Sequence, residues 1–525
     1  MDLDSPYLDY LCDQLAEVLE RYHPVDGIWF DMCWDQVSCS SWAIAAMTKK
    51  GLDPASDADR RRHAGELAEA SMARLAAQVR AAAPGALIYF NVRPVGNLPK
   101  EHQYMEQVEI ESLPTGGWGY MHFPKTVRRV RRFGKPYLGM TARFHGSWAD
   151  FGGLKPYPAL EYETSLMVAH GAQCSIGDQL HPRGRLEPEA YDLIGRAYAR
   201  IEAREPWLTG AVPVTEVAVI ETMPDHTQRH LQSIDGAVRM LNQLRQQFDI
   251  VRTDEDLSRY RLLILPDDMV IDERLAAKLR ARLAAGCRIL ATGWSGLSED
   301  ATAVVLSELG ISAHGESAFT DTYIRARPGS GVLRPDSDHV VHGKGVQVRP
   351  SGSSKVVADL VEPYFQRSWR GWCSHRQTPP DRVAEFAGAV VTGSTAYACW
   401  PLFDAFARHG NAPLRNLVGE LIDRLLPDPL LRAGGPTGLQ TTVCRQDQRL
   451  IAHLLFYPAE RRAVDIDLIE DIIPLHDVPL SVRAERSPRR VYLAPENRDL
   501  PFQYRAGRVE VVVPEIAGHA MVVFE

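Results

Sequence analysis

The feature that most constrains the fold is a short apolar segment that stops at an acid. Residues 22–31 read YHPVDGIWFD, so the run Ile28-Trp29-Phe30 ends directly at Asp31. Other short apolar segments end in the same way, at polar, ring or acidic side chains, near residues 86–92, 107–112, 136–141 and 173–178. Helical patterns separate these segments, at residues 6–21, 60–83, 124–133, 159–170 and 187–204. The alternation of strand and helix predicts a parallel α/β sheet or barrel.

Residues 1–208 favour a (β/α)8 TIM barrel, because chemistry in that fold sits at the C-terminal ends of the strands. We count about five strands where the barrel needs eight. The sequence therefore predicts a partial barrel that the chain enters in its middle.

Two more domains are predicted after the barrel region. Residues 211–430 continue the alternation and suggest a doubly wound α/β domain. This region lacks a G-x-G-x-x-G run, which argues against dinucleotide binding. From residue 435 to 525 the helical period gives way to Val-rich alternation, which predicts a β-sandwich.

The composition of the chain argues against several classes of binding partner. The 525 residues carry a net charge of -8, which argues against nucleic-acid binding. No apolar stretch approaches the roughly 20 residues that span a bilayer, and the acidic start lacks the pattern of a secretion signal. The eight cysteines form no C-x-x-C pair, which disfavours a metal site or disulfide framework. We expect a cytoplasmic protein without nucleic-acid or membrane partners.

Three acids are the candidate catalytic groups. Asp31 ends its strand, where a bare buried carboxylate would be costly, although a helix N-cap or structural hydrogen bond would also explain it. Strand alternation puts Glu109 and Glu111 on one face. Glycoside hydrolysis needs such a carboxylate pair, one to attack or stabilise the anomeric carbon and one to protonate the leaving oxygen.

Aromatic and polar side chains follow the same strands and could hold a sugar. For any tryptophan core packing is the plain alternative, and for any histidine a structural hydrogen bond. The candidates are Asn91, Trp118, Arg143, His145, Trp148, Asp178 and His181. Other hydrolase classes find less support, because G-x-S-x-G and H-E-x-x-H are absent. Cys287 begins a predicted strand, so an amidotransferase nucleophile there is disfavoured.

The run YHPVDGIWFD resembles the fourth-strand motif of α-L-fucosidases, which ends in the nucleophilic aspartate. The order of barrel, amidotransferase-like domain and β-sandwich resembles β-galactosidases with a trimerisation domain. Stretches such as VEIESLPTGGWGY and SIGDQLHPRG are similar to bacterial glycoside hydrolases that combine both features. In that group the first three barrel strands precede the position of Met1, so we expect an N-terminally truncated chain. The resemblance also implies a homotrimer, a carbohydrate substrate and no cofactor.

The resemblance implies a retaining enzyme of α-L-fucosidase type. Asp31 would be the nucleophile and Glu111 the acid/base, with Glu109 as the reserve choice. The seven aromatic and polar candidates would hold the sugar ring and its hydroxyls. Two alternatives stay open: a β-galactosidase-type hydrolase, and a non-catalytic carbohydrate-binding or assembly remnant.

Overall fold

The structure is a computed structural model that describes residues 2–91, 93, 97–221, 230, 232–329 and 333–525. Its internal contacts divide the chain into two units. The first comprises Met1–Ala203 together with Ala459–Glu470, and the second comprises Arg204–Pro458 together with Asp471–Glu525. None of the described helices is both long and apolar enough to cross a membrane.

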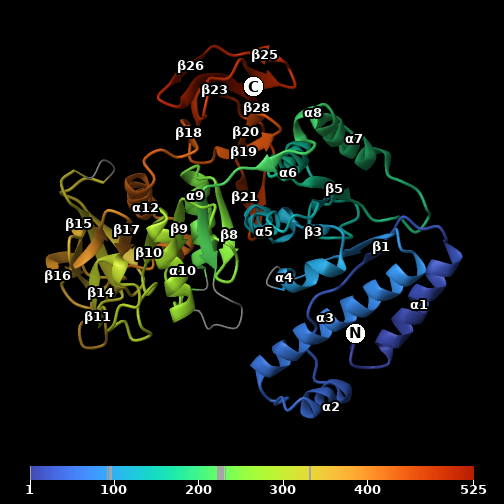
Figure 1. The fold of residues 1–525 in the computed structure, drawn as a ribbon, viewed down its shortest axis with the longest axis horizontal. Helices are drawn as coiled ribbons and strands as arrows, with labels where there is room; N and C mark the ends of the chain where they lie inside the picture. The colour runs from blue at the N-terminus through green and yellow to red at the C-terminus, as the bar shows by residue number, and fades with distance from the viewer. Residues whose placement is uncertain (1, 92, 94–96, 222–229, 231, 330–332) are drawn as a thin grey trace. The chain divides into compact units, whose positions relative to one another are not determined.

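The first unit alternates short parallel strands with helices (Figure 1). Its strands are β1 (Gly27–Phe30), β2 (Leu87–Phe90), β3 (Val108–Glu111), β4 (Tyr137–Ala142) and β5 (Gln173–Gly177). Its helices are α1 (Tyr7–Arg21), α2 (Ser41–Lys49), α3 (Asp57–Ala82), α4 (Leu98–Glu101), α5 (His122–Val130), α6 (Tyr157–Ala169) and α7 (Pro188–Glu202), with short 3-10 turns η1 (His102–Tyr104) and η2 (Pro114–Gly116). A hairpin of β21 (Glu460–Ala463) and β22 (Ile466–Leu468) completes the unit.

Parallel pairing joins β1 to β2, and β3 to β4 and then β5. Within the described residues, β1 pairs only with β2 and β5 only with β4. Gly27 permits the close approach at the start of β1, because a Cβ there would lie 2.9 Å from the carbonyl oxygen of Leu87. The five predicted strands are present to within two residues at either end, whereas helix α2 was not predicted.

A nine-stranded mixed sheet forms much of the second unit. The sheet order is β13-β12-β15-β16-β17-β10-β9-β7-β8. Its parallel part joins β7 (Val217–Glu221), β8 (Phe248–Arg252), β9 (Leu262–Leu265), β10 (Arg288–Thr292) and β17 (Thr395–Ala398). The sequences VAVIE and LLIL of β7 and β9 are almost wholly buried, as expected of parallel strands covered on both faces. Parallel pairing agrees with the predicted alternation of strand and helix, and the doubly wound layout stays a prediction.

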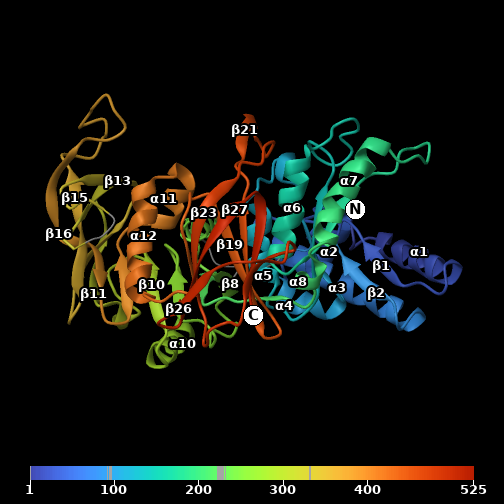
Figure 2. The ribbon, with the colours of Figure 1, turned by 90° about the horizontal axis from the view of Figure 1, so that it is seen from above.

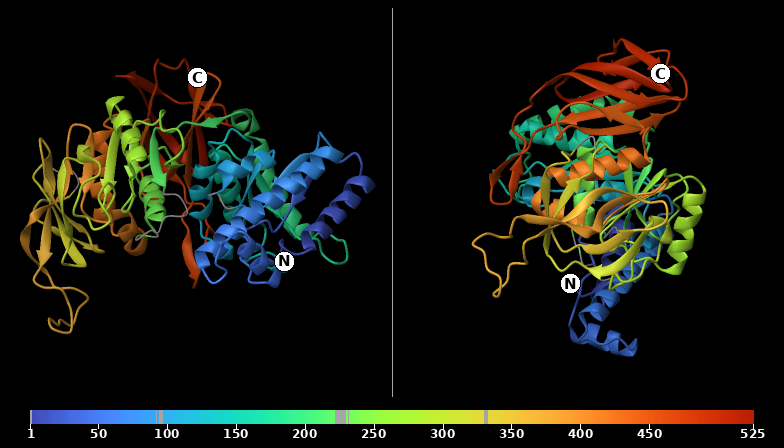
Figure 3. Two further views of the ribbon diagram at one scale, coloured as in Figure 1. Left: turned by 60° about the horizontal axis from the view of Figure 1, so that its bottom comes forward. Right: turned by 90° about the vertical axis from the view of Figure 1, so that its left-hand side faces the viewer.

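The remainder of the sheet is antiparallel and was not predicted. It consists of β12 (Asp321–Ala326), β13 (Asp338–His342), β15 (Lys355–Pro363) and β16 (Pro380–Val391). A separate pair joins β11 (Ile311–Glu316) to β14 (Val346–Pro350). The loop between β15 and β16 projects from the sheet (Figure 3). The helices are α9 (Ser233–Gln243), α10 (Glu273–Ala284), α11 (Leu402–His409) and α12 (Ala412–Leu425), with the 3-10 turn η3 (Ser307–Leu309).

Two antiparallel sheets complete the second unit and share one hydrophobic core, which includes Val443, Leu454, Val482, Val511 and Val522. One sheet contains β18 (Leu431–Ala433), β23 (Leu475–Arg483), β26 (Phe502–Arg505) and β27 (Arg508–Ile516). The other contains β6 (Val212–Pro213), β19 (Gln440–Gln446), β20 (Arg449–Phe456), β24 (Val491–Ala494), β25 (Arg498–Asp499) and β28 (Gly518–Phe524). The short helix α8 (Glu205–Leu208) precedes β6. Strands β6 and β18 lie outside the predicted range 435–525.

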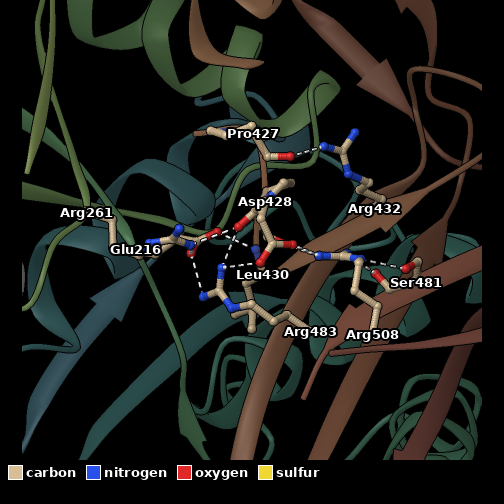
Figure 4. Close-up of polar contacts among 10 residues, drawn as sticks. Glu216, Arg261, Pro427, Asp428, Leu430, Arg432, Ser481, Arg483 and Arg508 are labelled. Atoms are coloured by element: carbon tan, nitrogen blue, oxygen red, sulfur yellow. Dashed lines mark hydrogen bonds and ion pairs between the residues drawn. The ribbon is translucent and has the colours of Figure 1, made fainter. Parts of the chain in front are cut away.

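A group of charged residues holds the connection between α12 and β18 (Figure 4). We call Glu216, Arg261, Asp428, Arg483 and Arg508 the linker cluster. Arg261 and Arg483 each donate to Glu216 Oε2 at 2.8 Å, and Arg508 donates to Asp428 Oδ1 at 2.5 Å. The buried Glu216 also accepts from the backbone N–H of Leu430. These bonds tie the linker to the strands on both of its sides.

Candidate active site

Asp31 follows the last residue of β1, as the sequence predicted. The carboxylate is exposed, and its Oδ1 accepts hydrogen bonds from the backbone N–H of Met32 at 2.8 Å and from Asn91 Nδ2 at 3.0 Å. Met32 has φ of +59°, a left-handed conformation that non-glycine residues adopt only at some cost. The chain therefore turns sharply at the strand end, with Asp31 open to solvent on one side and bonded on the other.

Asn91 joins the two predicted catalytic strands. Its side chain is buried, and its Nδ2 donates to Asp31 Oδ1 and to Glu111 Oε2, each at 3.0 Å. Both partners are carboxylates, so the amide must present its NH2 group to them. The backbone N–H of Asn91 donates to the carbonyl oxygen of Phe30 at 2.8 Å, which continues the β1–β2 pairing and fixes the amide in place.

This shared amide sets the distance between Asp31 and Glu111. Two oxygens that both lie 3.0 Å from one nitrogen can be no more than about 6 Å apart. Carboxyl groups about 5–5.5 Å apart are typical of retaining glycosidases, whereas inverting enzymes separate them by about 6.5–9.5 Å.

Glu111 is the last residue of β3 and is held on both carboxylate oxygens. Oε2 accepts from Asn91, and Oε1 accepts from the indole Nε1 of Trp148 at 2.7 Å. The next residue, Ser112, donates its backbone N–H to the carbonyl oxygen of Met140 at 2.8 Å, so the strand end is anchored to β4. Trp148 thus bonds Glu111 directly, whereas its predicted contact with a sugar stays a prediction.

Glu109 lies two residues earlier on the same face of β3. Its Oε2 accepts a hydrogen bond from Trp29 Nε1 at 2.5 Å. Burial raises the pKa of Glu109, the bond from Trp29 lowers it, and the charges of Glu111 and Asp31 raise it further, with a net upward shift. The three acids therefore interact through space, and Glu109 takes up a proton more readily than an ordinary glutamate.

Arg143 and Asp178 bind each other in the structure. Arg143 Nε donates to Asp178 Oδ1 at 2.8 Å, and its Nη2 donates to Glu187 Oε2 at 3.0 Å. The guanidinium also lies 4.2 Å from the centroid of the Phe144 ring. The Arg143 side chain is only 2% exposed, so it braces the loops after β4 and β5 and offers a ligand little surface.

The other predicted sugar contacts lie on loops of the same unit. Trp118 is partly exposed and packs edge-on against His122 at 4.8 Å between ring centroids. His181 Nδ1 accepts from the backbone N–H of Arg183 at 3.2 Å. His145 is half-buried. These contacts do not reach Asp31 or Glu111, so the structure gathers Asp31, Asn91, Glu111 and Trp148 and leaves the remaining sugar-contact roles as predictions.

Sequence reasoning missed Trp29 and Glu187. Trp29 lies two residues before Asp31, and strand alternation alone puts both on one face. That signal places the indole on the face of Asp31, and only the structure shows that it donates to Glu109. Glu187 lies in the connection between β5 and α7, where no pattern in the sequence connects it to Arg143.

Two carboxylates that share one amide donor at the ends of β1 and β3 are the kind of acid pair that glycoside hydrolysis needs. Comparison with known proteins also indicates a glycoside hydrolase. A family model described as the beta-galactosidase trimerisation domain matches residues 217–313. No curated protein matches the chain significantly.

Solved structures match along essentially the whole of this chain and about four fifths of their own length. The chain is 34% identical to alpha-L-fucosidase isoenzyme 2 from Paenibacillus thiaminolyticus, with a TM-score of 0.95. The match covers 100% of this chain and 80% of the fucosidase chain. Beta-galactosidase from Bacillus circulans sp. alkalophilus matches at 14% identity and a TM-score of 0.70, over 100% of this chain and 83% of that one. The cold-adapted beta-galactosidase from Rahnella sp. R3 matches at 14% identity and a TM-score of 0.69, over 99% of this chain and 82% of that one.

The chain belongs to the glycoside hydrolases that carry a beta-galactosidase trimerisation domain, and it is a glycosidase. The two galactosidase matches, at 14% identity, show the shared fold alone.

Proposed function

We propose that this glycosidase is a retaining exo-enzyme of α-L-fucosidase type that removes a terminal sugar from oligosaccharides or glycosides. The observation that supports the proposal is the Asn91 amide, which bonds one oxygen of Asp31 and one of Glu111, so that these oxygens lie within about 6 Å of each other, less than the separation of about 6.5–9.5 Å in inverting enzymes. The 34% identity to an alpha-L-fucosidase supports the choice of sugar.

Asp31 attacks the anomeric carbon and forms a glycosyl-enzyme ester, while Glu111 protonates the leaving oxygen. Glu111 then removes a proton from the water that hydrolyses the ester. The assignment of Asp31 as nucleophile rests on the resemblance of YHPVDGIWFD to the fucosidase motif. The exposed position of Asp31 leaves its free oxygen open to a substrate.

The proposal includes the fold and boundaries of three domains. We assign β1 to β5 to a (β/α)8 barrel, residues 211–430 to an amidotransferase-like trimerisation domain and residues 435–525 to a β-sandwich. The family match at residues 217–313 supports a homotrimer. All eight cysteines are unpaired, as expected of a protein in a reducing compartment such as the cytoplasm.

Hydrolysis of 4-nitrophenyl glycosides tests the proposal. We expect turnover of the α-L-fucoside and an α-configured fucose as the first product in an NMR time course. Preferential turnover of the β-D-galactoside would favour the second candidate, which the trimerisation-domain match supports. Sugar binding without turnover of either substrate would contradict both and favour a non-catalytic carbohydrate-binding role.

A further inference from the structure

Residues 459–470 form an arm that belongs to the first unit, although the chain before and after it belongs to the second. Strands β21 and β22 pair as a hairpin, and Figure 2 shows β21 beside α6. Arg461 bonds Asp467 across the hairpin at 2.5 Å, and Arg462 bonds Glu470 at 2.6 Å. All four residues of β21 are exposed, whereas the end of β22 turns inward at Leu468 and Ile469, which are 9% and 1% exposed.

The inner side of the arm lies against the loop that follows β3. Strand β22 packs along η2, the turn that begins three residues after Glu111. The backbone of Ile469 and the charge of Asp467 both act on Tyr120, whose pKa is raised mainly by burial. Tyr120 in turn packs edge-on against Tyr162 of α6, with 5.3 Å between ring centroids. The arm therefore covers the loop at residues 112–120.

The other side of the same loop faces the residues that hold Trp148. A Cβ on Gly116 would lie 3.3 Å from the carbonyl oxygen of Gly146 and 3.5 Å from Cα of Ser147. Leu113 forms a buried cluster with Ala142 and Phe144, and Trp148 packs against this cluster. The turn η2 thus lies between the arm and the loop whose tryptophan donates to Glu111.

We propose that the arm is a positioning element for the acid/base: by backing η2, it holds Trp148 at hydrogen-bonding distance from Glu111. The inference rests on the proposed function of Glu111. Interiors are close-packed and transmit displacement, so a loosened η2 lets the 144–150 loop shift. In general, loss of a hydrogen-bond donor weakens the ionised form of a carboxylate relative to its protonated form.

The experiment compares the double variant Leu468→Ala/Ile469→Ala with the control Val464→Ser, which changes an 86% exposed side chain at the tip of the same hairpin. We expect the double variant to lose about tenfold in kcat, the size of one hydrogen bond to a charged group, with KM nearly unchanged. The alkaline limb of its pH–rate profile moves to higher pH. We expect the control Val464→Ser to keep the wild-type kcat and the wild-type pH–rate profile.

Trp148→Phe removes the same N–H donor directly and should move the alkaline limb in the same direction. Because both changes act on one bond, combining them should cost little more than Trp148→Phe alone. Additive losses in kcat, or a loss in kcat with an unmoved pH–rate profile, would overturn the proposal.

Hydrogen exchange of the unliganded protein provides a readout that does not need activity. We expect faster amide exchange at residues 112–120 and 144–150 in the double variant, with exchange in β24 and β28 unchanged. Unchanged exchange at 144–150 would overturn the arm's role even in an active enzyme. Absence of glycoside turnover in the wild-type protein would overturn the proposed function, while the exchange result would still decide whether the arm holds the Trp148 loop.

Discussion

The candidate active site and the linker cluster both concentrate carboxylates, but they hold them with different donors. In the site, Asp31, Glu109 and Glu111 accept hydrogen bonds from the neutral N–H groups of Asn91, Trp29 and Trp148. In the linker cluster, Glu216 and Asp428 accept from the guanidinium groups of Arg261, Arg483 and Arg508.

The difference teaches what each arrangement is suited to do. A neutral donor fixes the direction of a carboxylate without supplying a compensating charge, so the acid can gain and lose a proton or form a covalent bond. A guanidinium supplies the opposite charge and holds the carboxylate as a structural ion pair. The raised pKa of Glu109, with burial as its main cause and two further acids nearby, fits the first arrangement.

The largest effect should come from removing the charge of Asp31. Asp31→Asn keeps the shape of the side chain but abolishes the nucleophile, so we expect kcat to fall by at least about 10³-fold with an unchanged melting temperature. Steady-state kinetics and thermal unfolding measure the two quantities. Near-normal turnover would remove Asp31 from the mechanism. Azide rescue, with the configuration of the glycosyl azide formed, then separates its role from that of Glu111.

In the linker cluster the expected loss is one of stability. Glu216→Ala leaves the backbone N–H of Leu430, the half-buried Arg483 and the exposed Arg261 without their acceptor, which should destabilise the second unit by about 1–3 kcal/mol. Denaturant unfolding monitors this loss, and Glu216→Gln, which retains one acceptor oxygen, should lose less. Equal stability of Glu216→Ala and wild type would show that the guanidinium bonds do not stabilise the fold. The linker cluster would then not differ from the candidate site in the way described above.

Asn91→Ala tests the neutral donor itself. It removes both bonds that space Asp31 and Glu111, so we expect kcat to fall by about 10²-fold from lost orientation. Asn91→Asp should be worse, because a third negative charge would face the two carboxylates. An Asn91→Ala enzyme with wild-type kcat would mean that the spacing is set elsewhere.

The smallest effect concerns Glu109 and depends on pH. Its folded-state pKa is raised, so the wild-type protein loses stability relative to Glu109→Gln as pH rises from the ordinary glutamate value of 4.5 through the raised value. The variant keeps an acceptor for Trp29. We expect equal melting temperatures near pH 4 and a higher one for the variant at pH 7. A variant that is less stable at pH 7 would contradict the sign of the shift.

Much of the secondary structure followed from local pattern. The apolar runs that became β1, β7 and β9 were recognisable because each is short, rich in branched or aromatic residues and bounded by turns. The antiparallel strands at residues 311–391 were not, because β15 and β16 are only partly buried and carry no regular alternation of apolar and polar residues. The division into three domains at 208 and 430 stays a prediction.

The sequence by itself determined which carboxylates stand at strand ends and that Glu109 and Glu111 share a face, because strand periodicity is a local property. Only the tertiary structure decided their partners. Asn91 meets Asp31 and Glu111 across 60 and 20 residues, Trp148 meets Glu111 across 37, and Arg143 meets Asp178 across 35. Such contacts depend on strand order and loop packing, which bring together residues that no local pattern connects.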